Sequence, residues 1–124
     1  MAYILLVEDM AMVARTTVRI LGSRPVKWAE CDQAAIEALE ADDDVGVLLC
    51  DWRLDNSAMN ADDLLPTIFS RWPHLRQRTV VLSGGAGDVE QWAEERQLGF
   101  LRKPVAMKAL RALVDDYMAR FSSE

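Results

Sequence analysis

Residues that can bind a metal ion or accept a phosphoryl group follow four apolar segments of this sequence. The segment "YILLV" runs into Glu8 and Asp9, and "VGVLLC" runs into Asp51. Ser83 ends "TVVLS", and Lys103 ends "FLRK". Three carboxylates held close together repel one another unless a cation lies between them, and Mg²⁺ or Mn²⁺ prefers such oxygen ligands. A carboxylate beside such an ion and a lysine is suited to phosphoryl transfer.

These side chains meet only if the apolar segments are parallel strands of one sheet. Strands are predicted at 3–7, 26–29, 45–50, 79–83 and 100–103. Helices are predicted at 10–21, from Asp32 onward, at 63–72 and 88–98, and along an apolar stripe from Leu110 to Phe121. This alternation predicts an α/β fold with helices on both faces of a parallel sheet. Sites in such folds form beyond the carboxyl ends of the strands, where the polar residues stand.

Single residues indicate where three of these helices begin or end. Asp32 is expected to cap the second helix, and Gly99 to follow the C-terminus of the helix at 88–98. Pro66 is tolerated if the third helix begins near Asp63, because the proline then lies in the first turn.

Composition excludes several classes of protein. The chain has 124 residues, 51% of them hydrophobic, which predicts a single folded domain over 1–124. A net charge of −6 without a basic helix argues against a nucleic-acid partner. No apolar run is long enough to cross a membrane, and the N-terminus does not resemble a signal peptide. Cys31 and Cys50 are expected to be reduced core thiols of a cytoplasmic protein, and the lone His74 rules out a histidine metal site.

The polar segments resemble the motifs of one family, the receiver (response regulator) domains of two-component signal transduction. The matching pieces are "LLVED", "VLLCDWRL", "VVLSG" and "FLRKP", in the family's order and near its spacing. The resemblance covers essentially the whole chain. It implies a flavodoxin-like (βα)5 three-layer sandwich with strand order 2-1-3-4-5, and a phosphoprotein rather than a conventional enzyme.

The resemblance also implies how the phosphoryl group is received. Asp51 matches the aspartate that is phosphorylated by a sensor histidine kinase or a histidine phosphotransfer protein. Asp9 matches the direct Mg²⁺ ligand, and Glu8 matches the acid that holds a metal-bound water. The backbone carbonyl of Arg53 matches the third protein ligand of the metal.

Further matches concern how the phosphoryl group is sensed. Ser83 matches the hydroxyl that moves onto the phosphoryl group, Lys103 the family's lysine, and Phe100 the aromatic switch residue. Pro104 stands where the family often has a cis peptide bond. The surface formed by the fourth helix, the fifth strand and the last helix is the expected contact for a downstream protein or a second copy of the chain.

Some segments depart from the family pattern. The stretch "DNSAMNADD" lacks the usual proline at position 55 and is longer than the turn it replaces, so the 55–62 loop should differ in shape. Glycines at 84, 85 and 87 predict a mobile loop and a shortened fourth helix. Phe100 lacks the hydroxyl of a tyrosine, so its coupling to Ser83 should be steric.

Other functions compete with this interpretation. A Mg²⁺-dependent phosphatase or nuclease would need a second acid, for which Asp55 is the candidate. A nucleotide binder is disfavoured because the first loop offers acids instead of phosphate donors. A receiver-shaped module that is never phosphorylated is disfavoured by the acids and by Lys103. The sequence leaves open whether the chain acts alone or belongs to a longer hybrid kinase or regulator.

Overall fold

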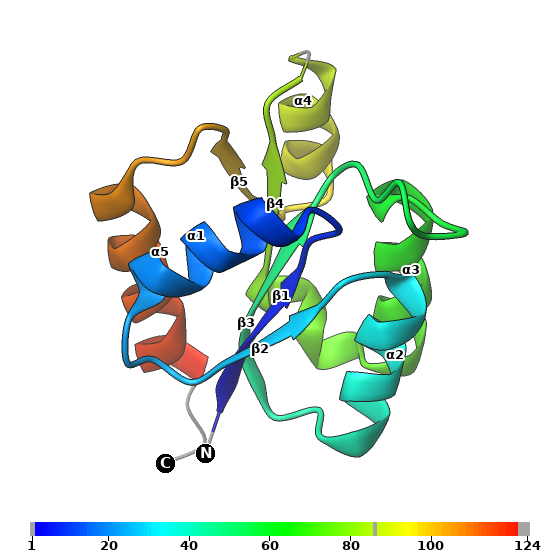
Figure 1. Ribbon diagram of the computed structural model, residues 1–124. Helices are drawn as coiled ribbons and strands as arrows, with labels where there is room; N and C mark the ends of the chain where they lie inside the picture. Colours follow the sequence, from blue (N-terminus) through cyan, green and yellow to red (C-terminus); the bar gives the residue numbers. More distant parts are fainter. Residues whose placement is uncertain (1, 86, 122–124) are drawn as a thin grey trace.

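The computed structural model describes residues 2–85 and 87–121, which contain one five-stranded parallel sheet in the order β2-β1-β3-β4-β5 (Figure 1). The strands are β1 (Tyr3–Val7), β2 (Val26–Ala29), β3 (Val45–Asp51), β4 (Thr79–Ser83) and β5 (Gly99–Arg102). The helices are α1 (Ala11–Leu21), α2 (Asp32–Ala41), α3 (Ala61–Arg71), the 3-10 helix η1 (Pro73–Arg78), α4 (Asp88–Glu95) and α5 (Met107–Phe121). The predicted fold class and strand order are confirmed.

Helices cover both faces of the sheet, and this explains why the inner strands are apolar except near their ends. Figure 1 shows α1 and α5 on one side of the sheet and α2 and α3 on the other. Alternate residues of β1 face these two layers: Leu5 packs with the α2–α3 core, whereas Ile4 and Leu6 pack with the α1–α5 core. Every residue of β1 and β3 is buried, as expected for central parallel strands.

The register of the strands aligns the ends that carry the polar residues. Val7 pairs with Cys50, and Asp51 pairs with Leu82 on the other side of β3. Ser83 pairs with Arg102, the residue before Lys103. The four polar ends therefore lie along the same edge of the sheet, and β3 reaches one residue further than predicted because Asp51 itself belongs to the strand.

The start of α2 differs from the prediction. Cys31, not Asp32, is the N-cap, and its Sγ accepts a hydrogen bond from the backbone N–H of Ala34 at 3.5 Å. Asp32 is the first helical residue, and its carboxylate accepts instead from the N–H groups of Gln33 and Met59. Cys31 is thus half-buried at a helix end, so the expectation of a core thiol is wrong for Cys31 and correct for the buried Cys50.

The prediction that Pro66 lies in the first turn of α3 is also wrong. The helix begins at Ala61, so Pro66 lies inside it, on its exposed side. A proline there removes one helical hydrogen bond. The helix nevertheless starts early because this register buries Leu64, Leu65 and Ile68 against the sheet, which stabilises it by more than the lost bond.

The fourth helix is short, as expected, but ends before the predicted residue. It runs for 8 residues to Glu95, and Gln97, with φ of 60°, takes the left-handed conformation that was expected of a glycine. Gly99 is the first residue of β5. A Cβ there would lie 2.9 Å from the Tyr117 hydroxyl and 3.0 Å from Val80, so close packing accounts for this glycine.

Residue 86 of the glycine-rich loop lies outside the described residues, and the predicted mobility of that loop stays a prediction. The peptide bond between Lys103 and Pro104 is cis, as the resemblance implied. Within 2–85 and 87–121, the helices are all too short or too polar to cross a bilayer.

Candidate functional site

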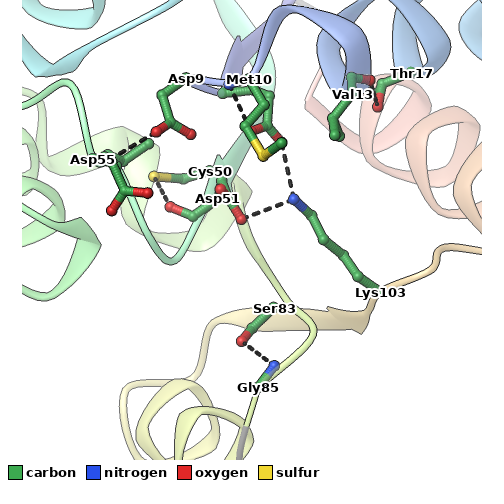
Figure 2. A network of polar contacts seen from close by, with 12 residues as sticks. Asp9, Met10, Val13, Thr17, Cys50, Asp51, Asp55, Ser83, Gly85 and Lys103 are labelled. Atoms are coloured by element: carbon green, nitrogen blue, oxygen red, sulfur yellow. Dashed lines mark hydrogen bonds and ion pairs between the residues drawn. The ribbon is translucent and has the colours of Figure 1, made fainter.

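A hollow of about 650 Å³ lies at the carboxyl edge of the sheet. Its lining includes residues at the ends of four strands and in the loop after β3: Asp9, Asp51, Arg53, Asp55, Ser83 and Lys103. Figure 2 shows the side chains of Asp9, Asp51 and Lys103 converging there. The strand ends that the sequence singled out therefore form one site.

Three carboxylates gather at the base of this site. Glu8, Asp9 and Asp51 each place an oxygen within 4.8 Å of the others. Glu8 is only 1% exposed and Asp51 only 8%, because Glu8 directly follows the buried strand β1 and Asp51 is the last residue of the buried strand β3. Negative charge is thus concentrated where water screens it poorly.

Lys103 joins two of these acids. Its Nζ lies 2.9 Å from Glu8 Oε1. The same Nζ lies 3.0 Å from Asp51 Oδ1 (Figure 2). Its backbone N–H donates to the Ser83 carbonyl at 2.9 Å, which fixes the start of the side chain. Burial lowers the pKa of Lys103, but the hydrogen bonds to Glu8 and Asp51 outweigh it and raise that pKa overall. The amine is therefore a permanent cation of the site.

One lysine does not balance three acids. Burial is the main reason that the pKa of Asp51 rises to about 6; the hydrogen bond from Lys103 lowers it, and the charges of Glu8 and Asp9 raise it further. All three acidic side chains offer oxygen donors, and the cluster keeps an excess of negative charge. This donor set fits a hard divalent cation such as Mg²⁺.

Contacts with the backbone fix the first loop of the site. Asp9 Oδ2 accepts from the N–H of Asp55 at 2.8 Å, and Glu8 Oε2 accepts from the N–H of Met10 at 3.2 Å. The indole N–H of Trp28, on the edge strand β2, donates to the Glu8 carbonyl at 2.6 Å. Nothing in the spacing of Trp28 in the sequence indicates this bond from β2 to the end of β1.

The other predicted residues lie at different distances from the acids. Ser83 is buried, and its Oγ accepts from the N–H of Gly85 at 3.1 Å, so the hydroxyl hydrogen is available to another acceptor. Arg53 lines the hollow with an exposed side chain. Phe100 lies on β5, half-buried against the α2–α3 core with the Arg102 guanidinium 5.7 Å from its ring centre, and does not line the hollow.

Two tryptophans connect the site to α4. Trp52, next to Asp51, meets Trp92 of α4 edge to face, with ring centres 4.9 Å apart. The Arg96 guanidinium lies 4.2 Å from the centre of the Trp92 ring. The sequence showed both tryptophans but not their contact, because the residues lie far apart in the chain.

The Asp51→Asn variant should unfold at a higher temperature than the wild-type protein when no metal is present. The wild-type pKa of about 6 lies above the usual 3.8, so the folded state holds the proton more tightly than the unfolded chain. Ionising Asp51 therefore costs stability as pH rises from about 4 to 7. The variant should gain on the order of 1 to 2 kcal/mol above about pH 7 and nothing below about pH 4.

Thermal melts of both proteins in a chelator, from acidic to neutral pH, measure this difference. Asp9→Asn is the matched comparison and should gain less, because its carboxylate is more exposed and accepts the Asp55 N–H. A difference in melting temperature between Asp51→Asn and the wild type that does not change with pH would contradict the repulsion among the acids. A lower melting temperature for Asp51→Asn at neutral pH would contradict it as well.

No protein-family model matches this chain, and no curated protein matches its sequence. Solved structures do match it. A response regulator receiver domain from Clostridium thermocellum is 21% identical with a TM-score of 0.79, covering 97% of this chain and 96% of that one. The receiver domain of NtrX from Brucella abortus is 23% identical with a TM-score of 0.81, covering 94% and 98%.

A third solved structure extends the likeness. A CheY-like receiver domain from Methanospirillum hungatei JF-1 is 18% identical with a TM-score of 0.76 and covers 97% of this chain and 98% of that one. The chain therefore has the fold of response regulator receiver domains.

Proposed function

We propose that this chain is a receiver domain that accepts a phosphoryl group on Asp51 and signals through the resulting change of its surface. The observation that carries the proposal is the pairing of Asp51 with Lys103 at 3.0 Å beside Glu8 and Asp9, at the carboxyl edge of the sheet. The receiver fold supports it, because the four motifs of the sequence fall at the strand ends of that fold.

In the proposed reaction, a carboxylate oxygen of Asp51 attacks the phosphorus of a phosphohistidine. The bond from phosphorus to the donor nitrogen breaks, and an acyl phosphate forms on Asp51. Lys103 contributes a fixed positive charge toward the phosphoryl oxygens, and Ser83 has a hydroxyl hydrogen to donate to one of them.

Mg²⁺ would be held by Asp9, Asp51 and the backbone carbonyl of Arg53, with Glu8 acting through water; Mn²⁺ fits the same donors. When bound, the ion supplies positive charge that offsets the transferred phosphoryl group. The cluster itself supports the presence of the ion, since the single positive charge of Lys103 does not balance its three carboxylates.

The switch is proposed to begin at Ser83. A phosphoryl group on Asp51 offers new acceptors, which favour a position of the Ser83 hydroxyl nearer to Asp51. Phe100, one strand further along the sheet, would fill the space that Ser83 leaves. The change would reach a downstream protein, or a second copy of the chain, through the face formed by α4, β5 and α5.

The proposed phosphoryl donor is a sensor histidine kinase or a histidine phosphotransfer protein, and the proposed location of this chain is the cytoplasm. NtrX from Brucella abortus also matches as a longer chain, with 22% identity, a TM-score of 0.84 and 96% of this chain covered, but only 27% of that chain. In that protein the segment that matches this chain is one part of a larger chain. A further part of a longer chain could likewise receive the signal from the face formed by α4, β5 and α5.

Mass spectrometry after incubation with Mg²⁺ and acetyl phosphate tests the function. We expect one phosphoryl group per chain, on the peptide that contains Asp51. Asp55 lines the same hollow, so a phosphatase that uses Asp55 as its second acid is the competing function. Sustained turnover of a phosphoester that is lost in Asp55→Ala would favour the phosphatase and overturn the proposal.

Trp52 should report occupation of the site by fluorescence. Its backbone N–H is fixed to the Leu82 carbonyl at 2.9 Å, its neighbours Asp51 and Arg53 are proposed metal ligands, and its ring touches Trp92. Adding Mg²⁺ or beryllofluoride should change the emission, and Trp52→Phe should remove most of that change.

Trp72→Phe is the matched control, because Trp72 follows α3 and lines a pocket with Asp42 and Asp43, away from the metal site. It should keep the response. Trp28 also contacts the acidic loop, so a response that survives in Trp52→Phe and disappears in Trp28→Phe would contradict the assignment of Trp52 as the reporter.

A further inference from the structure

The loop between β3 and α3, residues 52–60, contacts the metal-ligand cluster on one side and the first turn of α2 on the other. This is the loop whose length departs from the family pattern. It is closed at its base by the Trp52 carbonyl, which accepts from the Ala61 N–H at 3.3 Å, and by Asn60 Oδ1, which accepts from the Leu54 N–H at 2.9 Å. Leu54 is 1% exposed and anchors the loop in the core.

On the site side, the loop holds Asp9. The Asp55 N–H donates to Asp9 Oδ2 at 2.8 Å, and the Asn56 side-chain amide donates to the Asp9 carbonyl at 3.4 Å. A hydrogen bond from a fixed N–H restricts the rotation of a carboxylate and so determines which way its other oxygen points. The orientation of Asp9 therefore depends on where the loop lies.

On the opposite side, Asp32 and Ser57 hold the loop to α2. Asp32 is only 8% exposed, and its Oδ2 accepts from the Met59 N–H at 3.2 Å. Its other oxygen accepts from the Gln33 N–H at 2.8 Å, which fixes the carboxylate at the helix N-terminus, where negative charge is favoured. The Asp32 N–H donates in turn to Ser57 Oγ at 2.8 Å.

The contacts of the loop with Asp9 and with Asp32 are both costly to lose. A buried carboxylate is stable only when its oxygens accept hydrogen bonds, and those to a charged acceptor are among the stronger ones in proteins. Since residues 55 and 56 contact Asp9 while Ser57 and Met59 contact Asp32, a shift at the α2 side is transmitted to Asp9 through the few residues between them.

We propose that Asp32, assisted by Ser57, is a positioning residue of the metal site: it holds the 52–60 loop so that the Asp55 N–H orients the Asp9 carboxylate toward the cation. The inference rests on the proposed function to the extent that Asp9 is a metal ligand. Asp32 is not among the residues that would hold the cation or the phosphoryl group. It acts on metal affinity rather than on the transfer step.

The test compares Asp32→Ala and Ser57→Ala with Asp62→Ala. Asp62 is exposed in the first turn of α3. Its replacement by alanine removes the same charge from a helix N-terminus but removes no side-chain contact with the 52–60 loop. Asp32→Ala should weaken Mg²⁺ binding, measured by calorimetry, about tenfold, as is typical for groups that orient a metal ligand. Its phosphorylation rate at saturating Mg²⁺ should stay within about twofold of the wild-type rate.

Ser57→Ala should show a smaller loss of the same kind, and Asp62→Ala should bind Mg²⁺ as the wild type does. Amide hydrogen exchange in the metal-free proteins gives a second measurement, since the Asp55 N–H should exchange faster in Asp32→Ala than in Asp62→Ala. Equal Mg²⁺ affinities for these two variants, or unchanged exchange at Asp55, would overturn the inference.

A loss of phosphorylation rate in Asp32→Ala at saturating Mg²⁺ that is as large as its loss of Mg²⁺ affinity would also overturn the inference, because it would indicate general loosening of the fold. If the wild-type protein binds no Mg²⁺, the proposed function fails first. The exchange of the Asp55 N–H then still decides whether Asp32 holds the loop. The two failures are therefore distinguishable.

Discussion

Asp51→Asn is expected to take up no phosphoryl group under conditions that label the wild-type protein to one group per chain. An amide at this position has no carboxylate oxygen to attack phosphorus, and no other acid of the site lies at the end of β3 beside Lys103. The loss should be complete with acetyl phosphate and with a phosphorylated histidine kinase. The label on the wild-type protein should survive acid and be lost in base, as an acyl phosphate is.

Asp55→Asn is the matched control for this experiment. It lies in the same hollow and removes the same charge, but its contact with Asp9 is made by its backbone N–H, which the variant keeps. It should be labelled as the wild type is. A label that persists in Asp51→Asn and disappears in Asp55→Asn would mean that Asp55, and not Asp51, accepts the phosphoryl group. A chelator should stop the labelling of both wild type and control if the cluster holds the metal as proposed.

The convergence of the acids was predictable because it follows from strand periodicity alone. Parallel strands place their carboxyl ends on one edge, so acids after β1 and β3 meet without any knowledge of loops. The strand order also followed, since the motifs resembled those of a known fold. The pairing of Lys103 with both Glu8 and Asp51 was only partly expected, because Glu8 was assigned to a metal-bound water.

Helix ends and loops were less predictable because one residue type serves several purposes. Gly99 has the spacing of a helix C-cap, but the structure uses its missing side chain for packing against Tyr117. Asp32 has the type of an N-cap, but its carboxylate is engaged with a loop 27 residues further along the chain. Such choices depend on three-dimensional neighbours that no local pattern encodes.

The contacts of the 52–60 loop show the same limit at the site itself. The sequence indicated that this loop is unusual, and its composition of Asp, Asn and Ser is typical of a turn. It did not indicate that the Asp55 N–H binds Asp9 or that Ser57 binds α2, since both partners are distant in the sequence. The acids were found by pattern, but the groups that orient them were not.

Lys103→Met should destabilise the metal-free protein by about 3 kcal/mol at neutral pH, because it leaves buried carboxylates without their cation. Glu8 is 1% exposed and would keep its hydrogen bond from the Met10 N–H, while Asp51 would lose its ion pair. The methionine preserves most of the length of the lysine side chain, so the loss reports charge rather than packing. Denaturant unfolding in the presence of a chelator measures it.

Arg102→Met is the matched control, since the adjacent residue also loses a cation. Its ion pair with Glu90 is exposed on both sides and is worth at most about 1 kcal/mol. Mg²⁺ should restore more stability to Lys103→Met than to the wild type, because the ion then supplies the only cation for the three acids of the cluster. Acidification should also narrow the gap, since protonating Asp51 removes the charge that Lys103 balances. Equal losses for the two variants would mean that the cluster does not depend on Lys103, and the proposed charge balance of the site would be wrong.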